Sequence, residues 1–221
     1  PTMSTQQTVT RLRVTEIFAS VQGEASRAGL PTVFVRLTGC PLRCVWCDTE
    51  YAFNGGRPRD LPAIRGGSAG HGLHHICVTG GEPLAQKGCH ELLTALCEAG
   101  YDVSLETSGA LDIAAVDPRV SRIMDLKAPG SGEVGKNRWD NLPLLTARDE
   151  LKIVIANADD YAWACEQLHA HDLAKRCPVL FSPVAGELAP AELAEWIVRD
   201  RLPVRFQMQL HKVLWADARG K

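Results

Sequence analysis

Three closely spaced cysteines are the residues whose types and spacing most directly suggest chemistry. Cys40, Cys44 and Cys47 lie in the segment Thr-Gly-Cys-Pro-Leu-Arg-Cys-Val-Trp-Cys-Asp-Thr, directly after an apolar run. Thiolates are soft ligands that favour zinc, copper(I) or an iron–sulfur cluster. Three cysteines on a four-iron cluster leave one iron open to a small chelating ligand, whereas a closed zinc site needs a fourth ligand. The spacing therefore favours a cluster, and the alternative is a zinc site completed by His71, His74 or His75.

A glycine-rich turn is the second feature with chemical meaning. Thr79-Gly80-Gly81-Glu82-Pro83 follows the apolar run 75–79, which is expected to be a strand. Paired glycines allow the backbone to approach a ligand closely. A plain strand-to-helix turn would use the same residue types, so the turn alone is weak evidence for a binding site.

Both motifs lie in a chain where short apolar runs alternate with helical patterns. Strands are expected at 33–37, 75–79, 102–106, 122–126, 151–155, 179–182 and 204–210. Helices are expected over 91–99, from Asp159-Asp160 onward and from Pro190 onward. Continuous apolar runs are typical of strands covered on both faces, and their alternation with helices predicts a parallel α/β sheet.

The length bounds the architecture. A closed eight-fold barrel usually needs ~250 residues, and this chain has 221. Because the sequence pattern indicates only about three long helices, we expect an incomplete, modified TIM-type barrel. A single domain is expected over 1–221, with a flexible N-terminus at 1–13 and a long surface loop at 51–72.

Composition excludes several classes of protein. Hydrophobic residues make up 45% of the chain, charged residues 23%, and the net charge is −2, so no global basic field favours nucleic-acid binding. No run reaches the ~20 apolar residues of a membrane span, and the N-terminus lacks a signal-peptide core. We therefore expect no membrane partner, a cytoplasmic location and no disulfide framework. The scattered cysteines are expected to be small buried side chains: Cys77, Cys89, Cys97, Cys165 and Cys177.

With both motifs present, the sequence resembles the radical S-adenosylmethionine (SAM) superfamily. There, C-x3-C-x2-C follows the first barrel strand, and a Gly-Gly-Glu-Pro-type turn follows the next. The resemblance implies a [4Fe–4S] cluster on Cys40, Cys44 and Cys47. Its open iron binds the amine and carboxylate of SAM, and one-electron reduction cleaves SAM to a 5′-deoxyadenosyl radical.

Within the superfamily, the chain resembles the 7-carboxy-7-deazaguanine synthase family of the 7-deazapurine (queuosine) pathway. The matching segments are Glu16 to Glu24, Val33 to Gly39, Cys47-Asp48-Thr49, Glu106-Thr107-Ser108-Gly109 and Gln209-x-His211-Lys212. Two departures are visible. Ala25 replaces the last glycine of the family's Q-G-E-G, and residues 125–127 read Asp-Leu-Lys where many relatives have Ser-Pro-Lys.

This family resemblance implies a reaction, in which 6-carboxy-5,6,7,8-tetrahydropterin becomes 7-carboxy-7-deazaguanine with loss of ammonia. Hydrogen is abstracted at C6, the ring contracts and the hydrogen returns, so that SAM is a cofactor. The resemblance also implies Mg²⁺ at Thr49, and SAM contacts from Trp46, Cys47, Asp48, Gly81, Glu82, Ser108, Asp125, Leu126 and Lys127. The substrate contacts it implies are Val21, Gln22, Gly23, Glu24, Arg36, Thr79 and His211.

Among these residues, Arg36 is suited to the substrate carboxylate because a guanidinium offers a bidentate fork. His211 and Lys212 either close the pocket or belong to a solvated tail. Relatives also imply a homodimer and a flavodoxin- or ferredoxin-type electron donor.

Two alternatives remain at this point. A glycyl-radical activating enzyme would share the cysteine motif and the glycine turn, but such enzymes often carry a further cysteine cluster, and none is seen here. A non-catalytic zinc-binding module would explain the three cysteines but not the Gly-Gly-Glu-Pro and Glu-Thr-Ser-Gly turns.

Overall fold

One nine-stranded sheet organises the protein in the computed structural model, which describes residues 9–216 and 218–221. The strand order is β3-β1-β2-β4-β5-β6-β7-β8-β9. The strands are β1 (Arg11–Val21), β2 (Pro31–Leu37), β3 (Arg57–Asp60), β4 (His75–Gly80), β5 (Asp102–Thr107), β6 (Ser121–Asp125), β7 (Glu150–Ile155), β8 (Val179–Pro183) and β9 (Arg205–Phe206).

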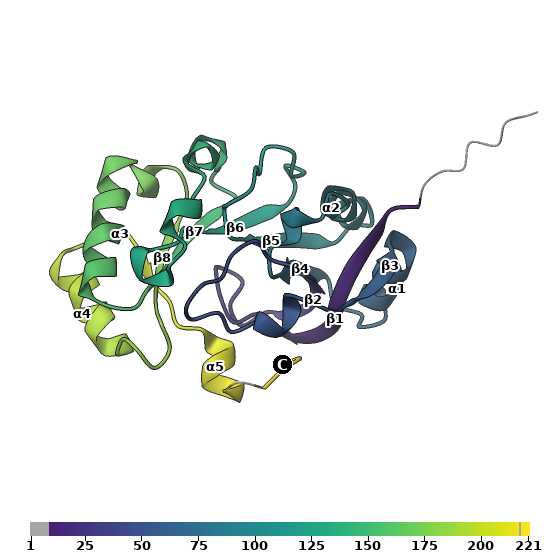
Figure 1. Cartoon of the computed structure of the whole chain (residues 1–221), viewed down its shortest axis with the longest axis horizontal. Coiled ribbons are helices and arrows are strands. Elements are labelled where there is room, and N and C mark those ends of the chain that lie inside the picture. The colour runs from purple at the N-terminus through teal and green to yellow at the C-terminus, as the bar shows by residue number, and fades with distance from the viewer. Residues whose placement is uncertain (1–8, 217) are drawn as a thin grey trace, which may run out of the picture.

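The sheet is parallel from β2 through β9 and does not close on itself. β1 runs antiparallel to both β2 and β3, and β3 and β9 form opposite edges of the sheet. Figure 1 shows the strands following one another in an arc, from β3 on the right to β8 on the left. The expected incomplete TIM-type barrel is thereby confirmed.

Helices cover the sheet and supply its core. They are α1 (Leu61–Ala69), α2 (Cys89–Glu98), α3 (Ala158–Ala170), α4 (Pro190–Arg199) and the short α5 (Leu210–Trp215). The three long helices α2, α3 and α4 confirm the sequence-based expectation, and α3 and α4 lie outside the β7–β8 end in Figure 1. Short 3-10 helices occupy connections at Glu50–Ala52, Pro83–Ala85, Pro129–Ser131, Val134–Lys136, Trp139–Leu144 and Leu173–Lys175.

The helices pack against the sheet through the apolar faces from which they were predicted. α2 buries Leu92, Leu93 and Leu96 in the main core, which contains Val33, Ile76 and other residues from the parallel strands. The Asn157 side chain caps α3 by accepting a hydrogen bond from the Asp160 amide at 3.0 Å. Pro190 lies in the first turn of α4, where its missing N–H costs nothing.

Three expectations about local structure were wrong. Residues 51–72 are not one long loop, because β3 and α1 lie within them. The side chain of Asp60 caps α1 by accepting from the Ala63 amide at 2.9 Å, and Ile64 is buried beneath the helix. The strand expected over 204–210 is reduced to Arg205–Phe206, after which the chain turns into α5. Residues 11–13 begin β1 rather than belonging to a flexible N-terminus. Residues 1–8 of that expected segment lie outside the described residues.

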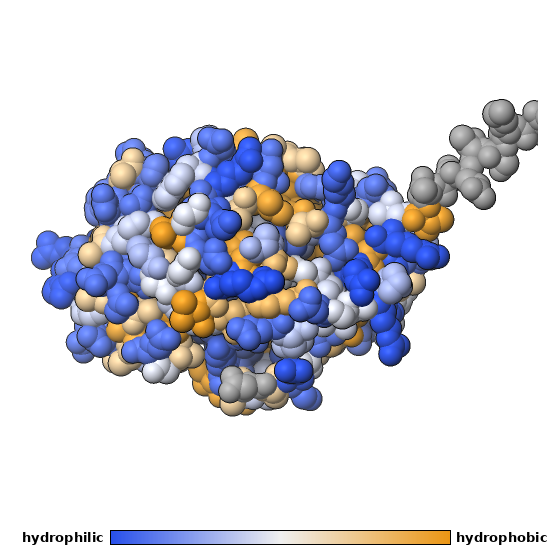
Figure 2. Space-filling view, in the orientation of Figure 1, coloured by the Kyte–Doolittle hydropathy of each residue, from blue (hydrophilic) through white to orange (hydrophobic). Residues whose placement is uncertain are grey.

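The outer surface is mixed in character. Figure 2 shows a face covered mainly by hydrophilic side chains with smaller hydrophobic areas between them. Among the described residues, no helix has the length and apolarity that crossing a membrane would require. Cys77, Cys89 and Cys177 are buried as expected, while Cys97 and Cys165 are only partly buried and pack against the core.

Candidate active site

A cavity of about 550 Å³ opens where the parallel strands end. The cysteine loop follows β2, Thr79 and Gly80 end β4, Thr107 ends β5 and Asp125 ends β6, and all of these border the cavity. Reacting groups gather at this end of barrel strands because the carboxyl ends of parallel strands meet at one edge. The fold therefore brings the separate sequence motifs into one site.

The cysteine loop and the glycine turn pack directly against each other. Cys40, Cys44 and Cys47 all border the cavity, and the Glu82 amide donates to the Gly39 carbonyl at 2.8 Å. A Cβ added to Gly81 would lie 2.4 Å from the Gly39 oxygen and 2.6 Å from the Cβ of Cys40. Only glycine at position 81 allows this approach, so the turn fixes the position of the cysteine loop.

The three thiols fit a cluster better than a single metal ion. Among the described residues, no three His, Cys, Asp or Glu side chains converge closely enough to hold one ion. His75, a zinc ligand in the alternative reading, contacts Thr32 at 2.8 Å and Ser104 at 3.0 Å. It begins β4, whereas the cysteine loop lies near the opposite end of that strand. Three partly exposed, unpaired thiols on one loop are the donor set that an iron–sulfur cluster uses.

The electrostatic setting of the thiols is mixed. Burial raises the pKa of the Cys40 and Cys44 thiols, and the nearby Lys127 ammonium opposes the rise at both positions. Lys127 is itself nearly buried and pairs with Asp125 at 3.0 Å. The Lys127 ammonium thus lies close to Cys40 and Cys44, where it would stabilise the negative charge of their thiolates.

The side chain of Glu82, which was expected to contact SAM, lies behind the cavity wall and joins two turns. Its carboxylate is fully buried, does not border the cavity, and accepts hydrogen bonds from the Ser108 amide at 2.7 Å and from Thr107 Oγ1 at 3.0 Å. Leu126 does not border the cavity either, because its side chain packs in the main core. The remaining residues expected to bind SAM do border it: Trp46, Cys47, Asp48, Gly81, Ser108, Asp125 and Lys127.

All residues expected to bind substrate border the same cavity: Val21, Gln22, Gly23, Glu24, Arg36, Thr79 and His211. His211 belongs to α5, which is tied to the loop after β1 by a hydrogen bond from the Leu210 amide to the Gly23 carbonyl at 2.9 Å. A Cβ on Gly23 would lie 2.2 Å from His211 Nδ1. His211 and Lys212 therefore line the pocket and do not form a solvated tail.

Arg36 is held rigidly at the cavity wall. Its Nε donates to Glu16 Oε1 at 2.7 Å, and the same oxygen accepts from the Tyr51 hydroxyl at 2.8 Å. The guanidinium lies 5.8 Å from the ring centroids of both Phe18 and Tyr51. One edge of the guanidinium is thus used by Glu16, and the side chain faces the pocket from a fixed position.

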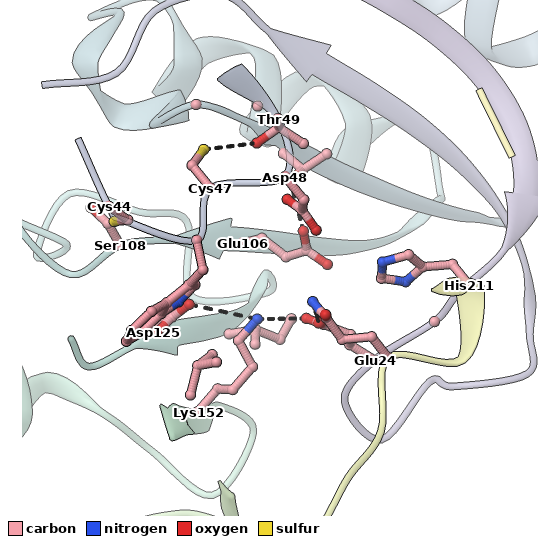
Figure 3. A pocket seen from close by; sticks show the side chains of 18 of the residues that line it. Glu24, Cys44, Cys47, Asp48, Thr49, Glu106, Ser108, Asp125, Lys152 and His211 are labelled. Atoms are coloured by element: carbon pink, nitrogen blue, oxygen red, sulfur yellow. Dashed lines mark hydrogen bonds and ion pairs between the residues drawn. The ribbon is translucent and has the colours of Figure 1, made fainter. Parts of the chain in front are cut away.

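Several polar residues of the cavity were not identified from the sequence as site residues, among them Glu106, Gln209 and Lys152. Glu106 accepts a hydrogen bond from Thr79 Oγ1 at 2.7 Å, and Gln209 donates to Glu24 Oε1 at 2.7 Å. The Lys152 ammonium lies 2.6 Å from Glu24 Oε2 and 3.6 Å from Asp125 Oδ2. Figure 3 shows Asp125, Lys152 and Glu24 in one row along the cavity. The family-like segments that contain Glu106 and Gln209 could have pointed to those two, but Lys152 had no such signal.

The two departures from the family pattern have clear structural outcomes. Ala25 has a left-handed backbone with φ 62°, a conformation in which glycine is less strained, so this position suits the glycine of the family pattern. Asp125, the first residue of Asp-Leu-Lys, pairs with both Lys127 and Lys152.

Comparisons with known proteins agree with this site. The model of the Radical SAM superfamily matches residues 34–176. The chain is 47% identical over 213 residues to 7-carboxy-7-deazaguanine synthase of Chlorobaculum tepidum, covering 95% of this chain and 97% of the relative. It is 42% identical over 223 residues to the synthase of Koribacter versatilis, covering 92% and 97%. The crystal structure of QueE from Escherichia coli superposes with a TM-score of 0.75 at 22% identity, covering 91% of this chain and 95% of that one.

The open barrel, the three-cysteine loop and the glycine turn thus define a radical SAM enzyme. Within that superfamily the chain belongs to the 7-carboxy-7-deazaguanine synthase family. These matches favour that family over the glycyl-radical activating enzymes and the zinc-binding modules considered as alternatives.

Proposed function

We propose that this chain converts 6-carboxy-5,6,7,8-tetrahydropterin to 7-carboxy-7-deazaguanine with release of ammonia, in 7-deazapurine biosynthesis. The observation that carries the proposal is a single cavity bordered both by the three cysteines and by Arg36, Glu24 and His211. When bound, the [4Fe–4S] cluster and SAM supply a 5′-deoxyadenosyl radical that takes hydrogen from C6 of the substrate. The chain's own residues bind and orient the two molecules so that this transfer is possible.

Arg36 is proposed to hold the substrate carboxylate. A fixed guanidinium facing a pocket is the natural partner of a carboxylate, because its geometry permits two parallel hydrogen bonds. Glu24 is proposed to accept hydrogen bonds from the amino-pyrimidine edge. Burial by itself would raise the pKa of Glu24, but Lys152 and the hydrogen bonds from Lys152 and Gln209 lower it to about 2. Glu24 is therefore an anion at neutral pH and can accept but not donate.

SAM is proposed to lie along Trp46, Asp48, Gly81, Ser108, Asp125 and Lys127, next to the three cysteines. Thr49 is proposed to bind Mg²⁺ beside the substrate, since Thr49 borders the cavity and hard cations prefer oxygen ligands such as its hydroxyl. Replacement of Thr49 by Val should remove the Mg²⁺ dependence of activity, while the Thr49→Ser variant should keep it. Equal Mg²⁺ dependence in both variants would contradict this role.

Further parts of the proposal concern the molecule as a whole. The described strands form one sheet, which supports a single domain. We also propose a homodimer, a cytoplasmic location and a flavodoxin- or ferredoxin-type protein as the electron donor, as the family resemblance implies.

Anaerobic reconstitution tests the proposed reaction. The protein is loaded with iron and sulfide, and SAM, Mg²⁺, dithionite and 6-carboxytetrahydropterin are added. Mass spectrometry should detect 7-carboxy-7-deazaguanine together with released ammonia. Formation of 5′-deoxyadenosine while the pterin stays intact would contradict the substrate and leave the superfamily assignment in place.

A further inference from the structure

Lys152 is a largely buried charged residue at the cavity wall, and the proposed function gives it no task. Lys152 belongs to β7, and its backbone lies directly beside Asp125 of β6 in the parallel register. Its side chain is only 12% exposed, and Glu24, its nearest partner, is 8% exposed. A buried ammonium is stable only when it is paired, and Lys152 is paired on two sides.

On the substrate side, Lys152 fixes the carboxylate of Glu24. Oε2 of Glu24 lies 2.6 Å from Lys152 Nζ, and Oε1 accepts from Gln209 Nε2 at 2.7 Å. Glu24 comes from the loop after β1, which is 128 residues away in the chain. The lysine thus sets the orientation of a carboxylate whose own backbone lies in a loop.

On the SAM side, Lys152 helps to fix Asp125. Both Lys127 and Lys152 approach the same oxygen, Oδ2, at 3.0 Å and 3.6 Å. The other oxygen, Oδ1, is buried and has no hydrogen-bond partner among the described residues. An unsatisfied buried acceptor costs free energy, and at the cavity wall a hydroxyl or amine donor of a bound molecule would satisfy it. The two lysines therefore hold Asp125 with one oxygen left for a ligand.

We propose that Lys152 is a positioning residue shared by the two ligands, which orients Glu24 for the pterin and Asp125 for SAM. The proposal rests on the proposed function. It predicts that Lys152 acts on pterin binding through Glu24 and on SAM binding through Asp125, and that it contacts neither molecule itself. Two double-mutant cycles separate this role from a purely structural one, since residues that act through one another are not additive.

The cycles use the cluster-loaded protein under anaerobic conditions and calorimetric titration. The probes are SAM alone and 6-carboxypterin alone, an aromatic analogue with no C6 hydrogen to lose. Lys152→Gln should weaken the binding of both probes by about tenfold or more, because truncating one partner of a buried charge pair is costly. Lys175, an exposed lysine paired with Asp172 at the surface, provides the control variant Lys175→Gln, which should leave both affinities unchanged.

The double variants decide the matter. Adding Lys152→Gln to Glu24→Gln should weaken 6-carboxypterin binding by no more than about twofold, and adding it to Asp125→Asn should do the same for SAM. Losses that multiply in either cycle would overturn the proposal, as would unchanged affinities in Lys152→Gln. Failure of Lys152→Gln to fold would overturn it too, since the lysine would then serve the fold. The proposed function fails separately, if the wild-type protein does not bind 6-carboxypterin.

Discussion

The buried carboxylate of Glu82 accepts a hydrogen bond from the backbone amide of Ser108 at 2.7 Å. This contact joins the turn after β4 to the turn after β5. The side-chain hydroxyls of Thr107 and Ser108 donate to the same carboxylate. The two turns that border the SAM part of the cavity are thus held together by one side chain that does not reach the cavity itself.

Replacing Glu82 should therefore damage the site indirectly. In the wild type, the carboxylate of Glu82 accepts hydrogen bonds from Thr107 and Ser108. The amide of Glu82→Gln has only one oxygen to accept them, so some of these donors lose their partner. We expect a loss of about 1–3 kcal/mol in the free energy of unfolding, and weaker SAM binding because Ser108 is displaced. Urea unfolding and calorimetric titration with SAM check this. The exposed Glu195 of α4 gives the matched control Glu195→Gln, and equal behaviour of the two variants would refute the role of Glu82.

Gly81→Ala should disturb the cysteine loop. The added Cβ would lie within 2.6 Å of both Gly39 O and Cys40 Cβ, so the loop must move, at a cost of about 1–3 kcal/mol. Iron and sulfide content after reconstitution should fall. Gly66→Ala is the matched control, because a Cβ there meets nothing within 4 Å. Normal cluster content in Gly81→Ala would show that the close approach is not required.

Arg36→Lys tests the proposed carboxylate clamp. Lysine keeps the charge but offers no planar fork, so we expect the KM for 6-carboxytetrahydropterin to rise about tenfold or more. SAM affinity should not change, because the residues expected to bind SAM lie elsewhere on the cavity wall. Arg59 on the exposed strand β3 supplies the control Arg59→Lys. A KM for the pterin that stays at the wild-type value would exclude the clamp.

His75 should make stability depend on pH. Burial, with a smaller effect from Arg27, lowers the pKa of His75 from 6.5 to about 4. The unfolded chain therefore takes up a proton near pH 6.5 and the folded chain only near pH 4. The contribution of His75 to the free energy of unfolding is therefore complete above pH 6.5. It is lost as the pH falls from 6.5 toward 4, by up to about 1.4 kcal/mol per pH unit.

The variant His75→Asn removes this titration and keeps a polar group between Thr32 and Ser104. Its free energy of unfolding should change less than that of the wild type between pH 7 and pH 5, the range where the effect begins. Parallel pH profiles of urea midpoints would show that His75 does not cause the dependence.

The parallel part of the fold was predictable because each of its strands is a short apolar run. Residues 75–79 and 151–155 were expected as strands and form most of β4 and β7. The same reasoning failed where other forces decide. β3 contains Arg-Pro-Arg-Asp and is a strand only because it pairs with β1, and α1 forms despite Gly66 and Gly67 because of its cap and of buried Ile64.

The site was predictable where residue types gather in short motifs. The three cysteines and the glycine turn needed only local spacing. Lys152 was missed because a single lysine in an apolar run looks like an ordinary strand residue, and its partner Glu24 is distant in sequence. The buried position of the Glu82 side chain was not predictable, because motif matching does not reveal which way a side chain points.

An unclosed sheet leaves two edges, and edges with free backbone groups invite pairing between separate chains. Here one edge is β3, where Pro58 has no amide hydrogen to donate and Arg57 and Arg59 are exposed. The other edge is β9, which is only two residues long. The barrel can therefore stay open around its cavity while offering little template for aggregation in a concentrated solution.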